Sequence, residues 1–140
     1  MSAEDNIALV HRFFDELVQN GNFEAIPTYL ATNHIAHDSG SPPIQGHEDW
    51  KQGSAAYFSA FPDTQVTFED EMAVGDKVVV RWTVRATHKG ALRNIHATGK
   101  QMTWTGITIV RIADGKIAEQ WQEADRLGIM HQLGAIPSMG

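Results

Sequence analysis

The stretch DGKIAEQWQEADRLGIMHQLG, from Asp114 to Gly134, decides the fold of this chain. It opens with Asp114-Gly115, a dipeptide typical of a tight hairpin turn. Side chains then alternate in character, and this alternation predicts a strand with two faces. One predicted face holds Ile117, Glu119, Trp121 and Glu123, and the other holds Ala118, Gln120 and Gln122. A short segment from 127 to 133 follows, and Gly134 is placed to end it.

Asp125 is the first candidate for chemistry because it has the same parity as Ile117, Glu119 and Trp121. If their shared face is the inside of a curved sheet, its carboxylate lies at the end of an apolar trough beneath a Trp ring. Burial there would suit Asp125 to proton transfer. The residues alone leave a second interpretation equally open, in which Asp125 is a solvated cap of the terminal helix.

Composition predicts one globular domain spanning residues 1–140, because 42% of the chain is hydrophobic and 20% is charged. The net charge of -6 argues against nucleic acid as a partner. No apolar run is long enough for a membrane span, and the acidic start MSAEDN does not resemble a signal peptide. The absence of cysteine excludes thiolate metal sites and agrees with the cytoplasmic location that we expect.

Local patterns predict helices in the first half of the chain and strands in the second. A helix capped by Ser2 is expected to run to about residue 19, followed by an irregular helix at 22–29, a strand at 32–38 and a helix at 46–60. Long strands are then expected at 65–74, 77–88 and 101–112 before the final strand. Helices followed by a meander of antiparallel strands indicate an α+β fold.

Several motifs together resemble one known family. The C-terminal stretch has the form GKI-x-E-x-W-x-x-x-D-x-x-G-x-x-x-QLG, and it is preceded by Phe61-Pro62-Asp63, GDKVVVRW at 75–82, Thr87-His88-Lys89-Gly90 and Thr98-Gly99-Lys100. These residues are similar to the SnoaL-like polyketide cyclases, or ester cyclases, of the NTF2-like superfamily. The resemblance spans nearly the whole chain and is more specific for the fold than for a substrate.

The resemblance implies a cone in which a curved antiparallel sheet wraps around three N-terminal helices and encloses a pocket. It also implies ring closure of a small hydrophobic polycarbonyl ester without a cofactor. In these cyclases an Asp at the position of Asp125 is the general acid/base, and it removes a proton from a carbon flanked by carbonyl groups. Some members use an imidazole near the position that is Thr108 in this chain.

His37 is the second catalytic candidate, since relatives carry a His near the pocket at this position. On a strand, His37 shares a face with Asn33 and Ile35, whereas His34 and Asp38 point the other way. That geometry argues against a metal site at His34 and His37. His37 could contact a substrate carbonyl or satisfy a loop carbonyl.

Five further residues are expected to bind substrate. Trp104 and Trp121 lie on neighbouring predicted strands and are expected to face one cavity, although core filling is the usual role of such residues. Thr108 shares the face of Trp104, and His88 lies at the rim of the sheet. Glu119 either joins Asp125 in the interior or pairs with Arg81 or Arg111.

The sequence is compatible with two other classes of function. The same fold hosts isomerases, dehydratases and epoxide hydrolases, and it also serves binding modules without chemistry. We expect an open pocket with Asp125 at its base in an enzyme, and a sealed interior in a binding module. A homodimer is expected through outer strand residues, namely Val79, Thr83, Ile107 and Ile109.

Overall fold

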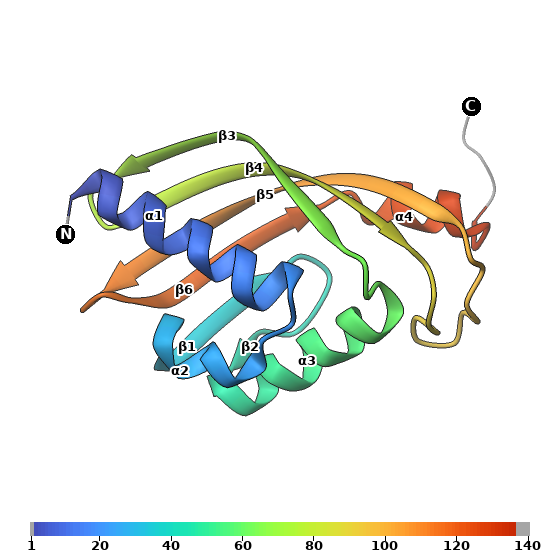
Figure 1. Ribbon diagram of the computed structural model, residues 1–140, viewed down its shortest axis with the longest axis horizontal. Helices are drawn as coiled ribbons and strands as arrows, with labels where there is room; N and C mark the ends of the chain where they lie inside the picture. The colour runs from blue at the N-terminus through green and yellow to red at the C-terminus, as the bar shows by residue number, and fades with distance from the viewer. Residues whose placement is uncertain (1, 137–140) are drawn as a thin grey trace.

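The chain folds into one six-stranded sheet that curves over its helices (Figure 1), as described for residues 2–136 of a computed structural model. The strand order is β2-β1-β6-β5-β4-β3, so the sheet is open with β2 and β3 at its edges. The strands are β1 (Leu30–Asp38), β2 (Ile44–Gln45), β3 (Gln65–Val74), β4 (Lys77–Thr87), β5 (Gln101–Ala113) and β6 (Lys116–Ala124). Neighbouring strands are antiparallel except β1 and β6, which run parallel.

The helices are α1 (Ala3–Phe13), α2 (Ile26–Tyr29), α3 (Gly46–Ala60) and α4 (Arg126–Leu133). A π-helical segment, Phe14–Gln19, extends α1, and a 3-10 turn, Phe23–Ala25, precedes α2. The predicted α+β class is confirmed, and the predicted helix at 46–60 has the observed bounds. None of the helices within residues 2–136 is long and apolar enough to cross a membrane.

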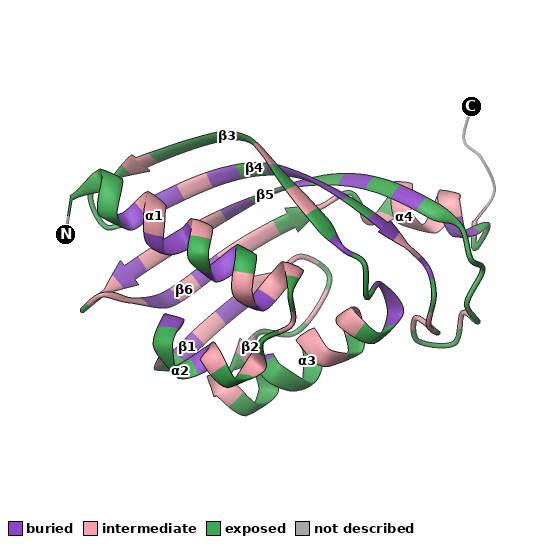
Figure 2. Ribbon diagram, in the orientation of Figure 1, coloured by how far each residue is buried: buried purple, intermediate pink, exposed green. Residues whose placement is uncertain are grey.

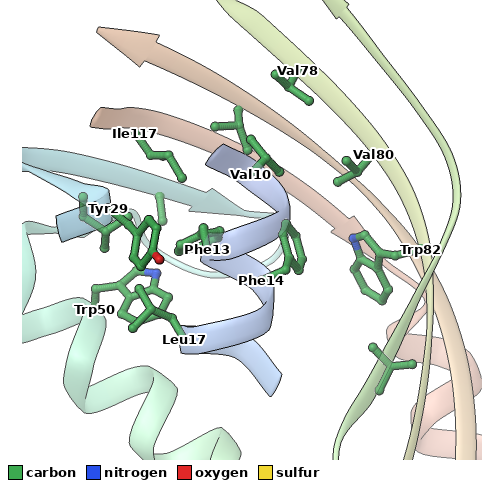
Figure 3. Close-up of a cluster of buried hydrophobic side chains, with 14 of the residues drawn as sticks. Val10, Phe13, Phe14, Leu17, Tyr29, Trp50, Val78, Val80, Trp82 and Ile117 are labelled. Carbon is green, nitrogen blue, oxygen red and sulfur yellow. The ribbon is translucent and has the colours of Figure 1, made fainter. Parts of the chain in front are cut away.

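Helix α1 forms where the sequence provides both a cap and an apolar stripe. The Ser2 hydroxyl accepts the backbone N–H of Asp5, and the Asp5 carboxylate accepts the Ser2 N–H in return, which completes the predicted capping box. Helical spacing then directs Val10, Phe13 and Leu17 into the concave side of the sheet, where they pack with Tyr29 and Trp50 (Figure 3).

Alternation along the strands separates a buried inner face from a partly exposed outer face (Figure 2). In β5, the buried inner residues are Met102, Trp104, Gly106, Thr108, Val110 and Ile112, and the predicted shared face of Trp104 and Thr108 is confirmed. Outward residues of β4 and β5 include Val79, Ile107 and Ile109. Thr83 also has the outward parity, but only 9% of it is exposed, so it adds little to that surface.

A β-bulge in β6 exchanges the two faces that alternation from Ile117 predicts for the rest of this strand. Ile112 is the partner of Ile117 whereas Arg111 is the partner of Glu119, so Ala118 is an extra residue in β6. Ile117 and Ala118 are both buried, and every later position faces the side opposite to the one that continued alternation from Ile117 would give. This one residue decides which side chains of β6 reach the interior.

Aromatic side chains fill the interior of the cone. Phe61 lies 5.1 Å from Trp104 and 5.4 Å from Tyr57 between ring centroids. The Trp82 ring extends from β4 over Gly106, where a Cβ atom would lie only 2.3 Å from the ring. The missing side chain at Gly106 is therefore what makes room for the indole, and the backbone pairs in regular register at this position.

Candidate functional site

Asp125 is an exposed cap of α4 and is not buried. Its backbone N–H donates to the carbonyl of Thr105, and its carboxylate accepts the backbone N–H of Gly128 at 2.9 Å. A Cβ atom at residue 128 would lie 2.2 Å from this carboxylate, which explains the Gly of the D-x-x-G motif. The predicted apolar environment of Asp125 is therefore wrong, because helix capping keeps the carboxylate at the surface.

The bulge also corrects the predicted faces of Glu119 and Trp121. Both lie on the outer face, since their Cα partners on β5 are Arg111 and Ile109, whereas Trp104 and Thr108 face inward. The two Trp residues therefore do not face a common cavity. Asp125 continues the outward parity of Glu119 and Trp121, as the sequence predicted, but that parity leads to solvent.

His37 shares the outer face of β1 with Ile35, away from the inner face of the sheet, and its predicted contact with substrate stays a prediction. Its Nε2 lies 2.7 Å from Glu119 Oε2, and its ring stacks on Trp121 at 5.6 Å between centroids. Arg111 donates to the other Glu119 oxygen at 3.2 Å, which confirms one of the two predicted partners. The hydrogen bond from His37, with help from Arg111, lowers the pKa of Glu119.

Of these side chains, His37 and Trp121 border a groove of about 380 Å³ on the outer face, next to the ends of β1 and β6. Ile107, Ile109 and Trp121 give it an apolar floor, and the loop after β1 closes one side. Asp38 and Gln122 are lining residues of this groove that also have inward parity on their strands. The groove therefore meets the inner face at the ends of β1 and β6.

A buried hydrogen-bond chain crosses the inner face from β4 to β6. The Trp82 indole N–H donates to the Thr108 hydroxyl at 2.9 Å, and that hydroxyl donates to Gln122 Oε1 at 3.3 Å. Trp82 is 4% exposed and Thr108 is fully buried, so both polar groups depend on this chain for partners. Thr108 is bonded to Gln122, and its predicted contact with substrate stays a prediction.

Asp38 is the carboxylate that sequence reasoning missed. It ends β1 opposite Gln122, on the inward parity that it shares with buried His34 and Ala36. Arg126 holds Asp38 Oδ2 at 2.6 Å, while the buried Oδ1 has no hydrogen-bond partner among residues 2–136. The alternation of β1 predicts that Asp38 and His37 lie on opposite faces of the strand, but it does not predict which face lies inside the cone.

His34 forms a second polar pair on the inner face. Its Nε2 lies 2.8 Å from Gln120 Oε1, so Nε2 carries the proton, and the buried Nδ1 is an acceptor without a partner in the described part of the chain. Burial lowers the pKa of His34 and keeps the ring neutral. Because His34 and His37 lie on opposite faces, they cannot share a metal ion. Within residues 2–136, no three His, Asp or Glu side chains gather as a possible metal site.

His88 supports a loop at the far end of the interior. Its Nδ1 accepts the backbone N–H of Thr98 at 3.2 Å, and its ring is fully buried at 5.5 Å from Phe61. Tyr57 lies in the same region, where burial raises its pKa to about 12. These contacts give His88 a structural role in closing the loop between β4 and β5, and its predicted contact with substrate stays a prediction.

Comparison with known proteins identifies a family and several similar folds. The model of the SnoaL-like polyketide cyclase family matches residues 8–133. Aklanonic acid methyl ester cyclase DauD of Streptomyces sp. (strain C5) is 28% identical over 108 residues, which cover 71% of this chain and 67% of that protein.

Two solved structures show the same architecture. A candidate polyketide cyclase from Acidithiobacillus ferrooxidans is 30% identical, with a TM-score of 0.83, and the match covers 98% of this chain and 100% of that one. A candidate SnoaL-like cyclase from Jannaschia sp. CCS1 is 24% identical with a TM-score of 0.88, and the match covers 96% of this chain and 95% of that one.

Proposed function

The chain belongs to the SnoaL-like polyketide cyclase family, and from this premise we propose that it closes a ring in a small polycarbonyl ester by an intramolecular aldol reaction. The relative DauD is named for the methyl ester of aklanonic acid, so an ester of this kind is the proposed substrate class. We assign proton transfer to Asp38, and the observation that carries this assignment is its buried, unpartnered Oδ1.

In the proposed reaction, the Asp38 carboxylate removes a proton from a carbon between two carbonyl groups. The resulting enolate carbon attacks a ketone of the same molecule, and a carbon–carbon bond forms. The new alkoxide then takes the proton back from Asp38, so the product has the same atoms as the substrate. Flanking carbonyls make such a carbon acidic enough for one oriented carboxylate, and the proposal therefore includes no cofactor.

Asp38 fits this role better than Asp125 for two reasons. The Arg126 side chain holds one Asp38 oxygen in place and leaves the other free, which orients the base. The Asp125 carboxylate is instead exposed to water and already accepts the Gly128 N–H. The role that the family resemblance gives to Asp125 is thus the direct competitor of this assignment.

The test compares Asp38→Asn with Asp125→Asn. Each purified protein is incubated with aklanonic acid methyl ester and with simpler β-keto esters, and ring closure is followed as a product of unchanged mass and altered retention. In D₂O, NMR reports enzyme-dependent exchange of the proton between the carbonyls. We expect Asp38→Asn to lower both rates about 100-fold to 10,000-fold, as loss of a general base does.

Asp125→Asn is the matched control, because asparagine also caps a helix and the variant should keep most of its activity. The ion pair of Asp38 is about one-third exposed, so its loss costs at most about 1 kcal/mol and the variant should fold. Full activity in Asp38→Asn, or loss of activity only in Asp125→Asn, would overturn the assignment.

The filled interior favours one alternative, a module that binds a small ligand without chemistry. Trp82, Trp104 and Phe61 occupy the space that a large substrate would need within the cone. Such a module would show saturable thermal stabilisation by β-keto esters, while ring closure and proton exchange would stay at the buffer rate in the unmodified protein. The assay above therefore separates the two functions.

We also propose that two copies pair through the outer face of the sheet. Arg81, Ile107 and Glu123 are Cα partners in one row across β4, β5 and β6. Ile107 is 46% exposed, and both flanking charges are exposed as well. A two-fold axis through Ile107 would place Arg81 of each copy against Glu123 of the other, as a self-complementary interface requires.

Charge reversal tests this dimer. Arg81→Glu and Glu123→Arg should each weaken self-association, because either change places like charges together at both symmetric contacts, and the double variant should restore it. Sedimentation velocity gives the association state of each protein. Val74→Glu, at an exposed position on edge strand β3, is the matched control. A monomeric unmodified protein, or a double variant no better than the single ones, would contradict the interface.

A further inference from the structure

We propose that the side-chain amide of Gln122 donates to the oxygen of the enolate, and that Trp82 and Thr108 set the direction of this amide. The inference rests on the proposed function, since it names the group that stabilises the enolate formed by Asp38. It follows from the donor-to-acceptor direction of the buried hydrogen bonds that run from Trp82 through Thr108 to Gln122.

The direction in which these hydrogen bonds are donated follows from the chemistry of the three side chains. An indole N–H can only donate, so the Thr108 hydroxyl must use a lone pair to accept it. The fully buried Thr108 hydroxyl must in turn donate its own proton, and among the hydrogen bonds within residues 2–136 its acceptor is Gln122 Oε1. The Gln122 amide is therefore held with its oxygen toward Thr108 and its two N–H groups pointing away.

Those N–H groups are free to bind a ligand. Within residues 2–136, no side-chain or backbone acceptor bonds Gln122 Nε2. Asp38 is the Cα partner of Gln122, and neighbouring strands lie about 4.8 Å apart. Gln122 and Asp38, with its unpartnered Oδ1, therefore occupy paired positions on β6 and β1, and both residues line the same groove. An enolisable carbonyl group needs this combination: an acceptor for the C–H proton and a donor for the oxygen that becomes negative.

Gln122 thereby acts as a catalytic donor, while Trp82 and Thr108 are positioning residues that prevent the amide from turning over. A turned amide would present its oxygen to the enolate and repel it. Fixing donors before charge develops is the general way in which enzymes stabilise oxyanions. An amide donor also needs no change of protonation state, so the stabilisation it provides does not depend on pH.

The probe is 4-nitrophenol, whose coloured anion imitates an enolate and reports its own ionisation. It is titrated into protein carrying Asp38→Asn, because the neutral amide stands in for Asp38 after it has taken the proton. In this background, Gln122→Leu should weaken binding of the anion about 10-fold to 100-fold, as loss of a hydrogen bond to a charged group does. Affinity for the neutral phenol should change little.

Thr108 variants distinguish a role in orienting the Gln122 amide from a role in protein stability alone. Thr108→Val, in the same background, should weaken anion binding about 3-fold to 10-fold through loss of amide orientation, and Thr108→Ser should restore it. A structural role alone would change the melting temperature without changing the ratio of anion to phenol affinity. Unchanged anion binding in Gln122→Leu overturns the inference, even where Asp38→Asn abolishes proton exchange. Conversely, Gln122-dependent anion binding in a protein with no exchange activity supports the donor and rejects the cyclase assignment.

Discussion

Replacement of Gly106 by alanine tests whether the Trp82 ring is packed against β5 as described. The new Cβ would lie 2.3 Å from Trp82 Cζ2, 2.4 Å from Cη2 and 2.8 Å from the backbone oxygen of Glu123. The backbone oxygen cannot move away easily, so the indole must shift. Overpacking of this kind typically costs about 1–3 kcal/mol.

The shift has a second cost, because Trp82 would lose its 2.9 Å hydrogen bond to Thr108, worth about 1 kcal/mol. Restriction of the unfolded chain by alanine offsets about 0.5 kcal/mol of this. We therefore expect Gly106→Ala to lower the free energy of unfolding by about 1.5–3.5 kcal/mol. For a domain of this length the melting temperature should fall by roughly 5–12 °C.

Thermal and urea unfolding, followed by tryptophan fluorescence and circular dichroism, measure this change. Gly53→Ala is the matched control, since its Cβ would meet only Ile44 Cδ1 at 3.8 Å within helix α3. That variant should gain about 0.5–1 kcal/mol, because alanine is the better helix former. The two glycine-to-alanine substitutions should therefore change the free energy of unfolding in opposite directions. If Gly106→Ala is as stable as the unmodified protein, the packing of Trp82 described here is wrong.

Three further predictions concern caps and charges. Ser2→Ala should lower the free energy of unfolding by about 1 kcal/mol through loss of the α1 capping box, as urea titration would show. Asp125→Ala should cost about the same by uncapping α4, whereas Asp125→Asn should not, and equal stability of all three proteins would exclude a capping role. Glu119 should contribute to acid sensitivity, because hydrogen bonds from His37 and Arg111 lower its pKa below the usual 4.5. As pH falls, the unfolded state binds the proton first, so the stabilisation from the Glu119 hydrogen bonds is present above pH 4.5 and is lost as pH falls through the folded pKa. The urea midpoint of Glu119→Gln should therefore depend less steeply on pH in that range than the midpoint of the unmodified protein.

Local sequence was sufficient for the architecture. The helix at 46–60 and the strand at 65–74 have the predicted bounds, and the Asp114-Gly115 turn adopts the positive φ angles of 52° and 74° that its residue types favour. These features depend on spacing and turn chemistry within a few residues of chain. The same is true of the α1 cap, where Ser2 and Asp5 are three residues apart.

The faces of β1 and β6 depended on tertiary structure. Alternation groups Glu119 with Trp121, and His34 with Asp38, but it does not say which group faces the helices. The β1 register places Asp38 beside Gln122 and turns His37 outward, and the bulge at Ala118 turns Glu119 and Trp121 outward as well.

The sequence by itself therefore determined the long elements, their order and the family of this chain, because these depend on local periodicity and on motifs read along it. It did not predict the two-residue strand β2, which forms by pairing with β1. Tertiary structure alone decided which carboxylate points inward. A strand has a period of two, so one inserted residue exchanges its two faces, and whether a residue is inserted depends on pairing with a distant strand. For that reason the sequence indicated Asp125 as the candidate base, whereas the folded chain supports the proposal of Asp38.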